Sequence, residues 1–557
     1  MNINVLNPMF LTDFYKTLHH VIYVDKLDFL TSYWTPRKVI WDRKDLLPNE
    51  VVVFGLQAFI KEWLIDYFNE AFFNRNVNEI VEEYETFLAN TFNEEIGKES
   101  QIIRDLHKLG YMPLSIRALP EGTIVPTKVP MIEITNTVKG FAWLVNYLET
   151  LFSCNMWLPS CAASIARIFR LNANKAWEDT CDSGSPRTFC CDFAMRGMGS
   201  MDAAMKSAAG HMLSFTGAST IPSYYWLEKY YNADSTNGKI AKCSPSTEHS
   251  VMSSYGPDKE VECYRTIIDK VKNGPLSIVS DTYDYWNLVT NVLVQLKDQI
   301  MNRNGKVLIR GDSGDPVDII CGWDIPVCKD MDAFDRLVIE SKHGLHLPTN
   351  NGSGKLFRER EYVRISGNYY TYKFGEKLIP VDLKDVPPEV KGTVECLWEI
   401  FGGTINSKGY KVLDSHIGAL YGDGITITRA NIIWERLRDK MFAASNVGLG
   451  VGSYTYQYNT RDTYGFALKA THAIVDGKPI LIYKDPKTDK DTLKKSHKGL
   501  CKVVLDNEGK PKCIDGFLER DDNYYKDNLM IDVFKDGKLL KETSLDEIRN
   551  TLWNNEF

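Results

Sequence analysis

The sequence contains no long apolar run and no excess of positive charge. Nowhere does it approach the ~18 consecutive apolar residues that a membrane-spanning helix needs. Its formal net charge is −7 at pH 7, so no overall positive field attracts nucleic acid or an anionic membrane surface. We therefore expect neither a membrane nor a nucleic acid among its partners.

The chain also lacks the marks of secretion and of a cysteine framework. The first residues, MNINVLNPMFLTDFYK, have neither the basic flank nor the uninterrupted apolar core of a signal peptide. The 12 cysteines show no C-x-x-C spacing, and Cys190 and Cys191 are adjacent, which suits a disulfide framework poorly. We expect reduced, mostly buried thiols and a cytoplasmic location, in the host cytoplasm if the protein is viral.

What the sequence does contain is a globular composition with a mixed beginning. Hydrophobic residues make up 44% and charged residues 25% of the 557 residues, near the averages of soluble domains. In residues 53–95 and 140–175 apolar side chains recur every three or four positions, which predicts helices. Residues 114–137 alternate and are interrupted by proline and glycine, which predicts short strands. We expect residues 1–160 to form a mixed α/β lobe.

From about residue 188, short apolar runs end in polar or glycine-containing loops that lead into helical stretches. The runs are TFCCDFAMRG, LSIVSDTYDYWN, KVLIRGDSGDP, IGALYGDGI and SNVGLGVGS. Ser280 and Arg310, at the ends of two runs, are 30 residues apart, which is the length of one βα unit. Repeated units predict a parallel (β/α) barrel over residues 161–453, with an active site at the carboxyl ends of its strands.

The separation between Arg310 and Gly422 is too long for a single βα unit. Residues at about 319–405 include a helix-like piece and an alternating hairpin that contains Tyr369 and Tyr372. We interpret this segment as an insertion on the barrel, with tyrosines that pack it and do not bind a ligand.

Charged residues at the strand ends indicate a phosphorylated sugar as the substrate. An arginine directly after an apolar strand, such as Arg310, is costly unless an anion meets it. Arg196 adds a second cation, and Asp284, Asp312 and Asp423 place carboxylates on three strand ends. Arginines bind phosphate, carboxylates stabilise a positive transition state, and Mg²⁺ accompanies a pyrophosphate. A lone DSGDP stretch is more often a turn or a helix N-cap, so the prediction depends on the whole constellation.

Two further features are weaker on their own. His249, in SPSTEHSV, is either a bystander in a polar loop or part of the site. The glycine-rich stretch GLGVGSYTYQYNTRD at 448–462 departs from G-x-G-x-x-G and leads into alternating Tyr and Thr, which does not predict a helix. Its backbone amides are still suited to cradle a phosphate, with Arg461 and Lys469 adding charge.

Ten short motifs extend over most of the chain: TDFYK, FGLQ, PEG, NYLETLF, DFAMRG, TEHSV, SDTYD, RGDSGDP, YGDG and TRD. In this order they resemble the nicotinamide phosphoribosyltransferases, in a microbial or viral branch. The resemblance implies the (β/α) barrel of the type II phosphoribosyltransferases joined to a mixed α/β lobe made from both chain ends, so that residues 454–557 complete the lobe. It also implies a homodimer whose active sites are shared between subunits.

The resemblance further implies roles for individual residues. A pyridine ring would stack between Phe193 and Tyr15 of the other subunit, Arg310 would hold its carboxamide oxygen, and Asp312 would lie near ring and ribose. His249 would belong to the pyrophosphate end, where ATP can phosphorylate the family's histidine. The predicted catalytic residues are His249, Asp312, Arg310 and Asp284, and the predicted substrate-binding residues are Asp13, Tyr15, Arg37, Phe193, Arg196, Ser219, Ser280, Gly422, Asp423, Gly452, Ser453, Arg461 and Lys469.

The implied reaction joins nicotinamide to the ribose C1 of phosphoribosyl pyrophosphate, giving nicotinamide mononucleotide and pyrophosphate in NAD synthesis, with Mg²⁺ held through the pyrophosphate. Two departures from the family pattern leave alternatives open. Ser219 stands where nicotinamide enzymes carry an aspartate, which keeps nicotinate as an alternative base. Gly452, Ser453 and Tyr454 replace a triple glycine, which keeps ADP-ribose 1-pyrophosphate, giving NAD directly, as an alternative donor.

Two other classes fit less well. A glycoside hydrolase needs a paired acid and nucleophile, whereas these loops are rich in arginine, histidine and glycine. A non-catalytic nucleotide sensor on the same fold would lose His249 or Asp312, and both are present. The sequence therefore favours an enzyme.

Overall fold

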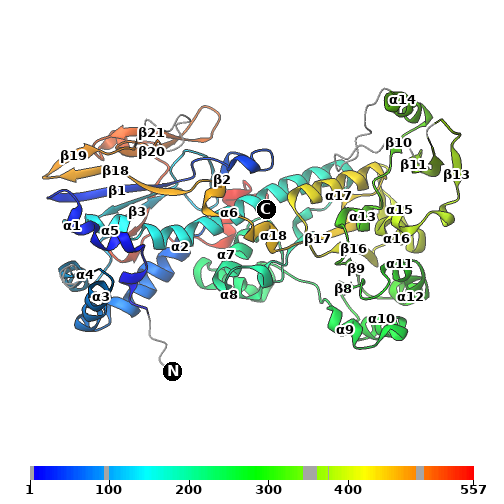
Figure 1. The fold of residues 1–557 in the computed structure, drawn as a ribbon, viewed down its shortest axis with the longest axis horizontal. Helices are drawn as coiled ribbons and strands as arrows, with labels where there is room; N and C mark the ends of the chain where they lie inside the picture. Colours follow the sequence, from blue (N-terminus) through cyan, green and yellow to red (C-terminus); the bar gives the residue numbers. More distant parts are fainter. Residues whose placement is uncertain (1–5, 93–99, 343–360, 374, 485–494) are drawn as a thin grey trace.

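The structure, a computed structural model, describes residues 6–92, 100–342, 361–373, 375–484 and 495–557. The molecule is elongated, with an α/β lobe at the left of Figure 1, a barrel at the right, and the long helix α6 (Glu149–Thr180) running between them. The predicted barrel with a mixed lobe is confirmed. Helix α6 crosses residue 160, where the sequence predicts the end of the first part of the lobe.

The lobe is built on an antiparallel sheet to which both chain ends contribute. Its strand order is β19-β18-β1-β5-β3-β22-β23. These strands are β1 (Leu27–Thr35), β3 (Leu114–Ala118), β5 (Ile132–Asn136), β18 (Ala467–Val475), β19 (Lys478–Leu481), β22 (Ile531–Lys535) and β23 (Lys538–Leu539). Because the C-terminal strands flank the N-terminal ones on both sides, the two chain ends form one lobe, as predicted.

A buried charge network holds the C-terminal segment on this sheet. Glu133 of β5 is 2% exposed, and it accepts hydrogen bonds from Tyr33 of β1 at 2.7 Å and from Arg520 at 2.9 Å. Burial opposes the negative charge, but the positive charges of Arg520 and Arg117 outweigh it and lower the pKa of Glu133. A buried carboxylate with these partners is stable only while both chain segments are in place.

The second sheet consists of parallel strands in the order β7-β6-β17-β16-β9-β8. They are β6 (Cys190–Asp192), β7 (Gly217–Ala218), β8 (Leu276–Val279), β9 (Val307–Gly311), β16 (Ile417–Tyr421) and β17 (Val447–Val451). Parallel bridges join Gly217 of β7 to Lys242, and Ser246 to Ser277 of β8. Residues 242–246 therefore connect the two edges, and the sheet curls into a barrel.

Between β9 and β16 the chain forms a small separate sheet in the order β10-β11-β12-β13. Its strands are β10 (Val327–Cys328), β11 (Glu361–Ile365), β12 (Asn368–Tyr372) and β13 (Ile379–Val381), and helix α14 (Met331–Lys342) follows β10 in the chain. Tyr369 and Tyr372 are 2% and 5% exposed, so they pack the insertion, as predicted. Helices α13 (Pro316–Cys321) and α16 (Thr393–Phe401) flank it and pack on β16.

Helices cover both parts of the molecule (Figure 1). Those not yet named include α3 (Val77–Thr91), α4 (Gln101–Leu109), α5 (Ala142–Tyr147), α7 (Met201–His211), α8 (Ile221–Tyr231), α10 (Glu260–Lys270), α12 (Leu293–Met301), α17 (Ile427–Asp439) and α20 (Leu545–Leu552). Residues 56–73 are also helical, through α2 (Leu56–Phe59) and π-helical turns. In the described ranges, no helix combines the length and the apolar character that a membrane span requires.

One buried arginine anchors the last helix, α20. Arg549 is 2% exposed, and its guanidinium donates hydrogen bonds to the carbonyl oxygens of Met212 at 2.6 and 2.9 Å, Lys239 at 3.0 Å and Ile240 at 2.6 Å. Met212 directly follows α7, so this side chain ties the C-terminal segment to the first helices of the barrel.

Replacing Arg549 with alanine should lower the free energy of unfolding by about 3 kcal/mol, because three carbonyls, two of them in buried hydrogen bonds, lose a charged donor. Thermal unfolding followed by circular dichroism would measure the change as a lower melting temperature. Arg438→Ala is the matched control, since Arg438 is about half exposed and pairs with the adjacent Asp439. Equal melting of the two variants would contradict the assigned role.

Candidate active site

Three predicted side chains converge on Gly422 at the carboxyl ends of the barrel strands. A Cβ atom added at Gly422 would lie 2.6 Å from Asp312 Oδ1, 3.5 Å from Arg310 Cδ and 3.7 Å from Phe193 Cε2. These residues come from the ends of β16, β9 and β6. The parallel register explains the convergence, because it pairs Tyr421 with Gly311 and so aligns the two strand ends. We call this end of the barrel the rim.

The ring of Phe193 needs glycine beneath it. A Cβ atom at Gly450 would lie 2.4 Å from Phe193 Cδ2, which is closer than any real contact, and the ring also lies near Gly422. Phe193 is held there by its backbone, since its N–H donates to the carbonyl oxygen of Val451 at 2.9 Å. The sequence does not predict Gly450 as a site residue, although Gly450 lies in the glycine-rich stretch at 448–462.

Arg310 is fixed by the segment that closes the barrel. Its Nη1 donates to Ser246 Oγ and its Nη2 to the carbonyl oxygen of Thr247, both at 3.0 Å. Its Nε is buried without a hydrogen-bond partner among the described residues. The guanidinium is therefore oriented by the protein, and the Nη1 and Nη2 hydrogens that these bonds do not use remain for a ligand.

His249 pairs with an aspartate that sequence reasoning missed. His249 begins α9 (His249–Ser253), and its Nε2 lies 3.1 Å from Asp281 Oδ1. The Asp281 side chain is 5% exposed, whereas that of His249 is 49% exposed. Both Asp281 and Asp284 belong to the SDTYD motif, and only the turn after β8 decides which one faces His249.

The two residues of this motif that the sequence predicts in the site, Asp284 and Ser280, have local roles in the structure. Asp284 is the N-cap of α11 (Tyr285–Asn287) and accepts a hydrogen bond from the N–H of Asn287 at 2.9 Å. Ser280 is 1% exposed and exchanges hydrogen bonds with Tyr264 and a backbone carbonyl. Asp315 similarly caps α13, so the DSGDP stretch contains a helix N-cap as well as Asp312.

The electrostatics of the rim are dominated by carboxylates. Burial raises the pKa of Asp312, and the neighbouring charges of Asp281 and Asp423 raise it further, while Arg310 opposes them. Like charges that gather at one edge are stable only when a cation or a hydrogen-bonded ligand compensates them. The arrangement therefore suits a substrate that becomes positively charged during the reaction.

A cavity of about 520 Å³ passes through the barrel behind Phe193. Its lining includes Phe193 at the carboxyl end of β6 and Lys306 just before β9, so it extends along the strands. Cys191 and Cys243 also line it. A hydrogen bond between these two thiols lowers the pKa of Cys243 to about 7. The cavity is large enough for a small planar ring and part of a ribose.

The glycine-rich stretch differs from the prediction, because a short helix follows it. Helix α18 (Ser453–Gln457) begins directly after Gly452. On a helix, residues four apart share a face, and so the rings of Tyr454 and Tyr458 stack at 5.3 Å on the surface. Tyr456 points the other way, is buried, and its hydroxyl lies 2.6 Å from His211 Nδ1.

The start of α18 packs against the DFAMRG turn, which carries Arg196. A Cβ atom at Gly197 would lie only 2.0 Å from Ser453 Oγ, so the two loops touch. Arg196 itself is exposed in this turn. Ser219, directly after β7, is exposed, and its backbone N–H donates to the carbonyl oxygen of Asp192. Arg196, Ser219, Gly452 and Ser453 thus all lie at the carboxyl ends of β6, β7 and β17.

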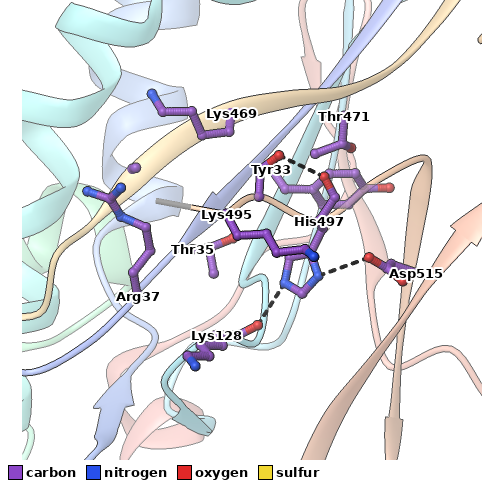
Figure 2. A pocket seen from close by; sticks show the side chains of 11 residues that line it. Tyr33, Thr35, Arg37, Lys128, Lys469, Thr471, Lys495, His497 and Asp515 are labelled. Carbon is purple, nitrogen blue, oxygen red and sulfur yellow. Dashed lines mark hydrogen bonds and ion pairs between the residues drawn. The ribbon is translucent and has the colours of Figure 1, made fainter. Parts of the chain in front are cut away.

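The lobe holds a second cavity, of about 270 Å³, lined mainly by cations and hydroxyl groups (Figure 2). Its lining residues include Arg37, Lys128, Lys469 and Lys495. Arg37 follows β1 and Lys469 lies on β18, so the sheet pairing brings these two predicted residues together. Such a set of cations suits a phosphate group.

The remaining predicted residues of the lobe are near its surface. Asp13 accepts a hydrogen bond from Thr150 at 2.6 Å, and Arg461 pairs with the adjacent Asp462 at 3.3 Å. Tyr15 is 62% exposed and precedes α1 (His19–Ile22), which lies at the far left of Figure 1. The barrel strands lie at the opposite side, so a single chain does not bring Tyr15 to Phe193.

Comparison with known proteins agrees with this architecture. Residues 189–537 match the family model described as "Nicotinate phosphoribosyltransferase (NAPRTase) family". The chain is 36% identical over 557 residues to a nicotinamide phosphoribosyltransferase of Acinetobacter baylyi, with 98% of this chain and 97% of that protein covered. It is 30% identical to a nicotinamide phosphoribosyltransferase of Mycoplasma genitalium, over 89% of this chain and 95% of that protein.

Among solved structures, the fold is similar to that of a nicotinate-nucleotide pyrophosphorylase from Pyrococcus furiosus. The TM-score is 0.50 at 14% sequence identity, and the alignment covers 100% of this chain and 96% of that one. At this identity the likeness concerns the fold alone.

The thiol of Cys243 should react with iodoacetamide from about pH 7 upward, because its lowered pKa yields the thiolate there. Peptide mapping by mass spectrometry across a pH series would locate the labelled residues. Cys154 serves as the internal control, since burial raises its thiol pKa and delays its labelling to higher pH. Labelling of Cys243 only in the ordinary thiol range, at about pH 8.5, would contradict the cavity's chemistry.

Proposed function

The chain belongs to the nicotinate phosphoribosyltransferase family, and from this membership we propose that it joins nicotinamide to the ribose C1 of phosphoribosyl pyrophosphate. The products are nicotinamide mononucleotide and pyrophosphate, which makes the protein a pentosyltransferase of NAD salvage. The observation that carries this conclusion is its 36% identity, over 98% of its length, to a nicotinamide phosphoribosyltransferase.

The pyridine ring lies on Phe193 in this proposal. The bare glycine backbone at Gly422 and Gly450 gives the Phe193 ring its place, and a flat ring can slide along it toward the sugar. Arg310, oriented by Ser246 and Thr247, donates to the carboxamide oxygen. The second face of the pyridine is covered by Tyr15 of the partner subunit.

Catalysis depends on charge and position. The pyridine nitrogen attacks C1 while pyrophosphate leaves, and positive charge develops on the ribose in an oxocarbenium-like state. Asp312, with Asp281 and Asp423 nearby, stabilises that positive charge. No proton has to be transferred at the reacting atoms, so the rim acts by preorganised electrostatics and by holding the two reactants in line.

The phosphate groups meet cations from two places. Arg196 and the Gly452–Ser453 backbone serve the barrel side, with Mg²⁺ bound through the pyrophosphate oxygens. Arg37 and Lys469 supply the cationic cavity of the lobe, which serves the site of the partner subunit. We therefore propose a homodimer with shared sites, working in the cytoplasm.

His249 is placed to accept a phosphoryl group from ATP in this scheme. Its Nε2 faces Asp281, which leaves Nδ1 directed away from the carboxylate and available as the nucleophile. Asp281 stabilises the ring once it is modified. The coupling would favour synthesis over the reverse reaction.

The alternative substrates are less favoured. The full-length relatives are nicotinamide enzymes, which favours nicotinamide over nicotinate despite Ser219. For the donor, Tyr456 is buried against His211 and is closed to an adenine, and Tyr454 and Tyr458 stack on each other so that only their outer faces are open. Phosphoribosyl pyrophosphate therefore remains the proposed donor.

The proposal predicts that purified protein with Mg²⁺, nicotinamide and phosphoribosyl pyrophosphate forms the mononucleotide, identified by mass. In parallel reactions nicotinate replaces nicotinamide, or ADP-ribose 1-pyrophosphate replaces phosphoribosyl pyrophosphate. Arg310→Ala and Asp312→Ala should each lose about 2–4 kcal/mol of transition-state stabilisation while remaining folded. Arg336→Ala, an exposed position on α14, is the control. Near-normal turnover in either rim variant would refute the assignment.

Shared sites predict complementation between two inactive variants. Tyr15→Ala removes the ring that covers the pyridine, and Arg310→Ala damages the barrel of the same chain. Mixing the two proteins under conditions of subunit exchange should restore part of the activity, because hybrid dimers contain one intact site. If native mass spectrometry detects hybrids and no activity returns, the sites are not shared.

A further inference from the structure

Three metal-binding side chains gather beside the cationic cavity of the lobe, away from the rim. They are His497, Cys501 and Cys513, and one nitrogen or sulfur atom of each lies within 4.8 Å of the others. Cys501 lies on β20 (Leu500–Leu505) and Cys513 on β21 (Pro511–Phe517), which pair as an antiparallel hairpin. His497 lies shortly before β20.

The hairpin is distorted where the cluster lies. Leu500 pairs with Phe517 and Lys502 with Ile514, so Asp515 and Gly516 both face the single residue Cys501. Gly516 has φ +94°, a left-handed conformation that glycine adopts without strain. This bulge places the Asp515 carboxylate next to the cluster on the His497 side, where Oδ2 lies 3.4 Å from His497 Nδ1 and accepts a hydrogen bond from the N–H of Lys498 at 3.1 Å.

The imidazole of His497 is oriented as in a metal ligand. Its Nε2 lies 2.8 Å from the carbonyl oxygen of Lys128, and since a carbonyl can only accept, Nε2 carries the hydrogen (Figure 2). Nδ1 then faces the cluster, where it lies 3.8 Å from Cys513 Sγ. Metal-bound histidines typically donate their second N–H to a carbonyl or carboxylate in this way.

The donor set selects the metal. Two sulfur atoms and one imidazole nitrogen exclude the hard cations Ca²⁺ and Mg²⁺, and with a fourth ligand they match tetrahedral Zn²⁺. We propose that His497, Cys501 and Cys513, with Asp515 as the fourth ligand, bind a structural Zn²⁺ ion.

The burial of the cluster supports a structural role for its sulfur atoms. Cys501 is 0% exposed, which argues against a role as a reactive thiol. Cys501 and Cys513 are both free thiols in the structure.

The ion would stiffen one wall of the cationic cavity. His497 and Asp515 line that cavity together with Arg37, Lys128 and Lys469 (Figure 2). Through His497, the ion would hold the carbonyl of Lys128, whose φ of +72° is unusual for a lysine. No step of the transfer reaction passes through the metal, so the proposal stands independently of the proposed function.

Metal analysis of the full-length protein tests the proposal. Protein produced with added zinc and purified without chelators should contain about one zinc per chain by plasma mass spectrometry. The double variant Cys501→Ser/Cys513→Ser should contain almost none. Cys154→Ser is the matched control. It should retain zinc, because Cys154 is not part of the cluster and a serine hydroxyl can keep the hydrogen bond that Cys154 donates to the Leu151 carbonyl.

Cobalt spectroscopy of the wild-type protein identifies the ligands without reference to activity or to the folding of a variant. Wild-type protein loaded with Co²⁺ should show thiolate-to-cobalt charge-transfer absorption in the near ultraviolet and tetrahedral visible bands. Asp515→Asn should release zinc to a chromogenic chelator at least about 10-fold faster than wild type. Wild-type protein without zinc, without cobalt–thiolate absorption, or with a Cys501–Cys513 disulfide in its mass would overturn the proposal.

Discussion

The parallel pairing of the barrel strands is the constraint on which the site depends. Every strand runs in the same direction, so the loops that follow β6, β8, β9, β16 and β17 all meet at one end. Polar side chains at this end cost little folding free energy, because each follows the last residue of a strand and so lies outside the apolar interior. Residues more than 200 positions apart, such as Phe193 and Gly422, thereby become neighbours. The chemistry of the rim is a consequence of strand direction.

The rim combines two features that would be unfavourable elsewhere. Glycine at 422 and 450 contributes no side chain to packing, yet it leaves room for the ring of Phe193. Asp312 is partly buried, which raises its pKa, and the nearby carboxylates of Asp281 and Asp423 raise it further. Both features reduce stability locally, and in the proposed mechanism both become useful when a flat base and a positively charged ribose occupy the site. The rest of the barrel must supply the stability that holds them.

The lobe provides the complementary half. Glu133, Arg520 and their partners fasten the C-terminal segment onto strands from the beginning of the chain. The pairing of β18 with β1 brings Arg37 and Lys469 into one cationic cavity. In one chain this cavity and the barrel rim belong to different parts of an elongated molecule (Figure 1). The proposed dimer would use both halves in one site, and the proposed zinc ion beside the cavity would keep its wall in a fixed shape while phosphate binds and leaves.

The sequence by itself determined the barrel, because periodic apolar runs report which residues are buried, and βα spacing reports how strands are connected. It also marked Arg310 and Asp312, which stand directly at a strand end. Only the tertiary structure decided between Asp281 and Asp284, since both follow the same strand and the turn alone selects the partner of His249. The helical form of α18 was equally undetermined, as five residues are too few for a period to be read. The cluster of Cys501 and Cys513 was invisible for a related reason: a hairpin register and a bulge bring these residues together, and no local spacing encodes either.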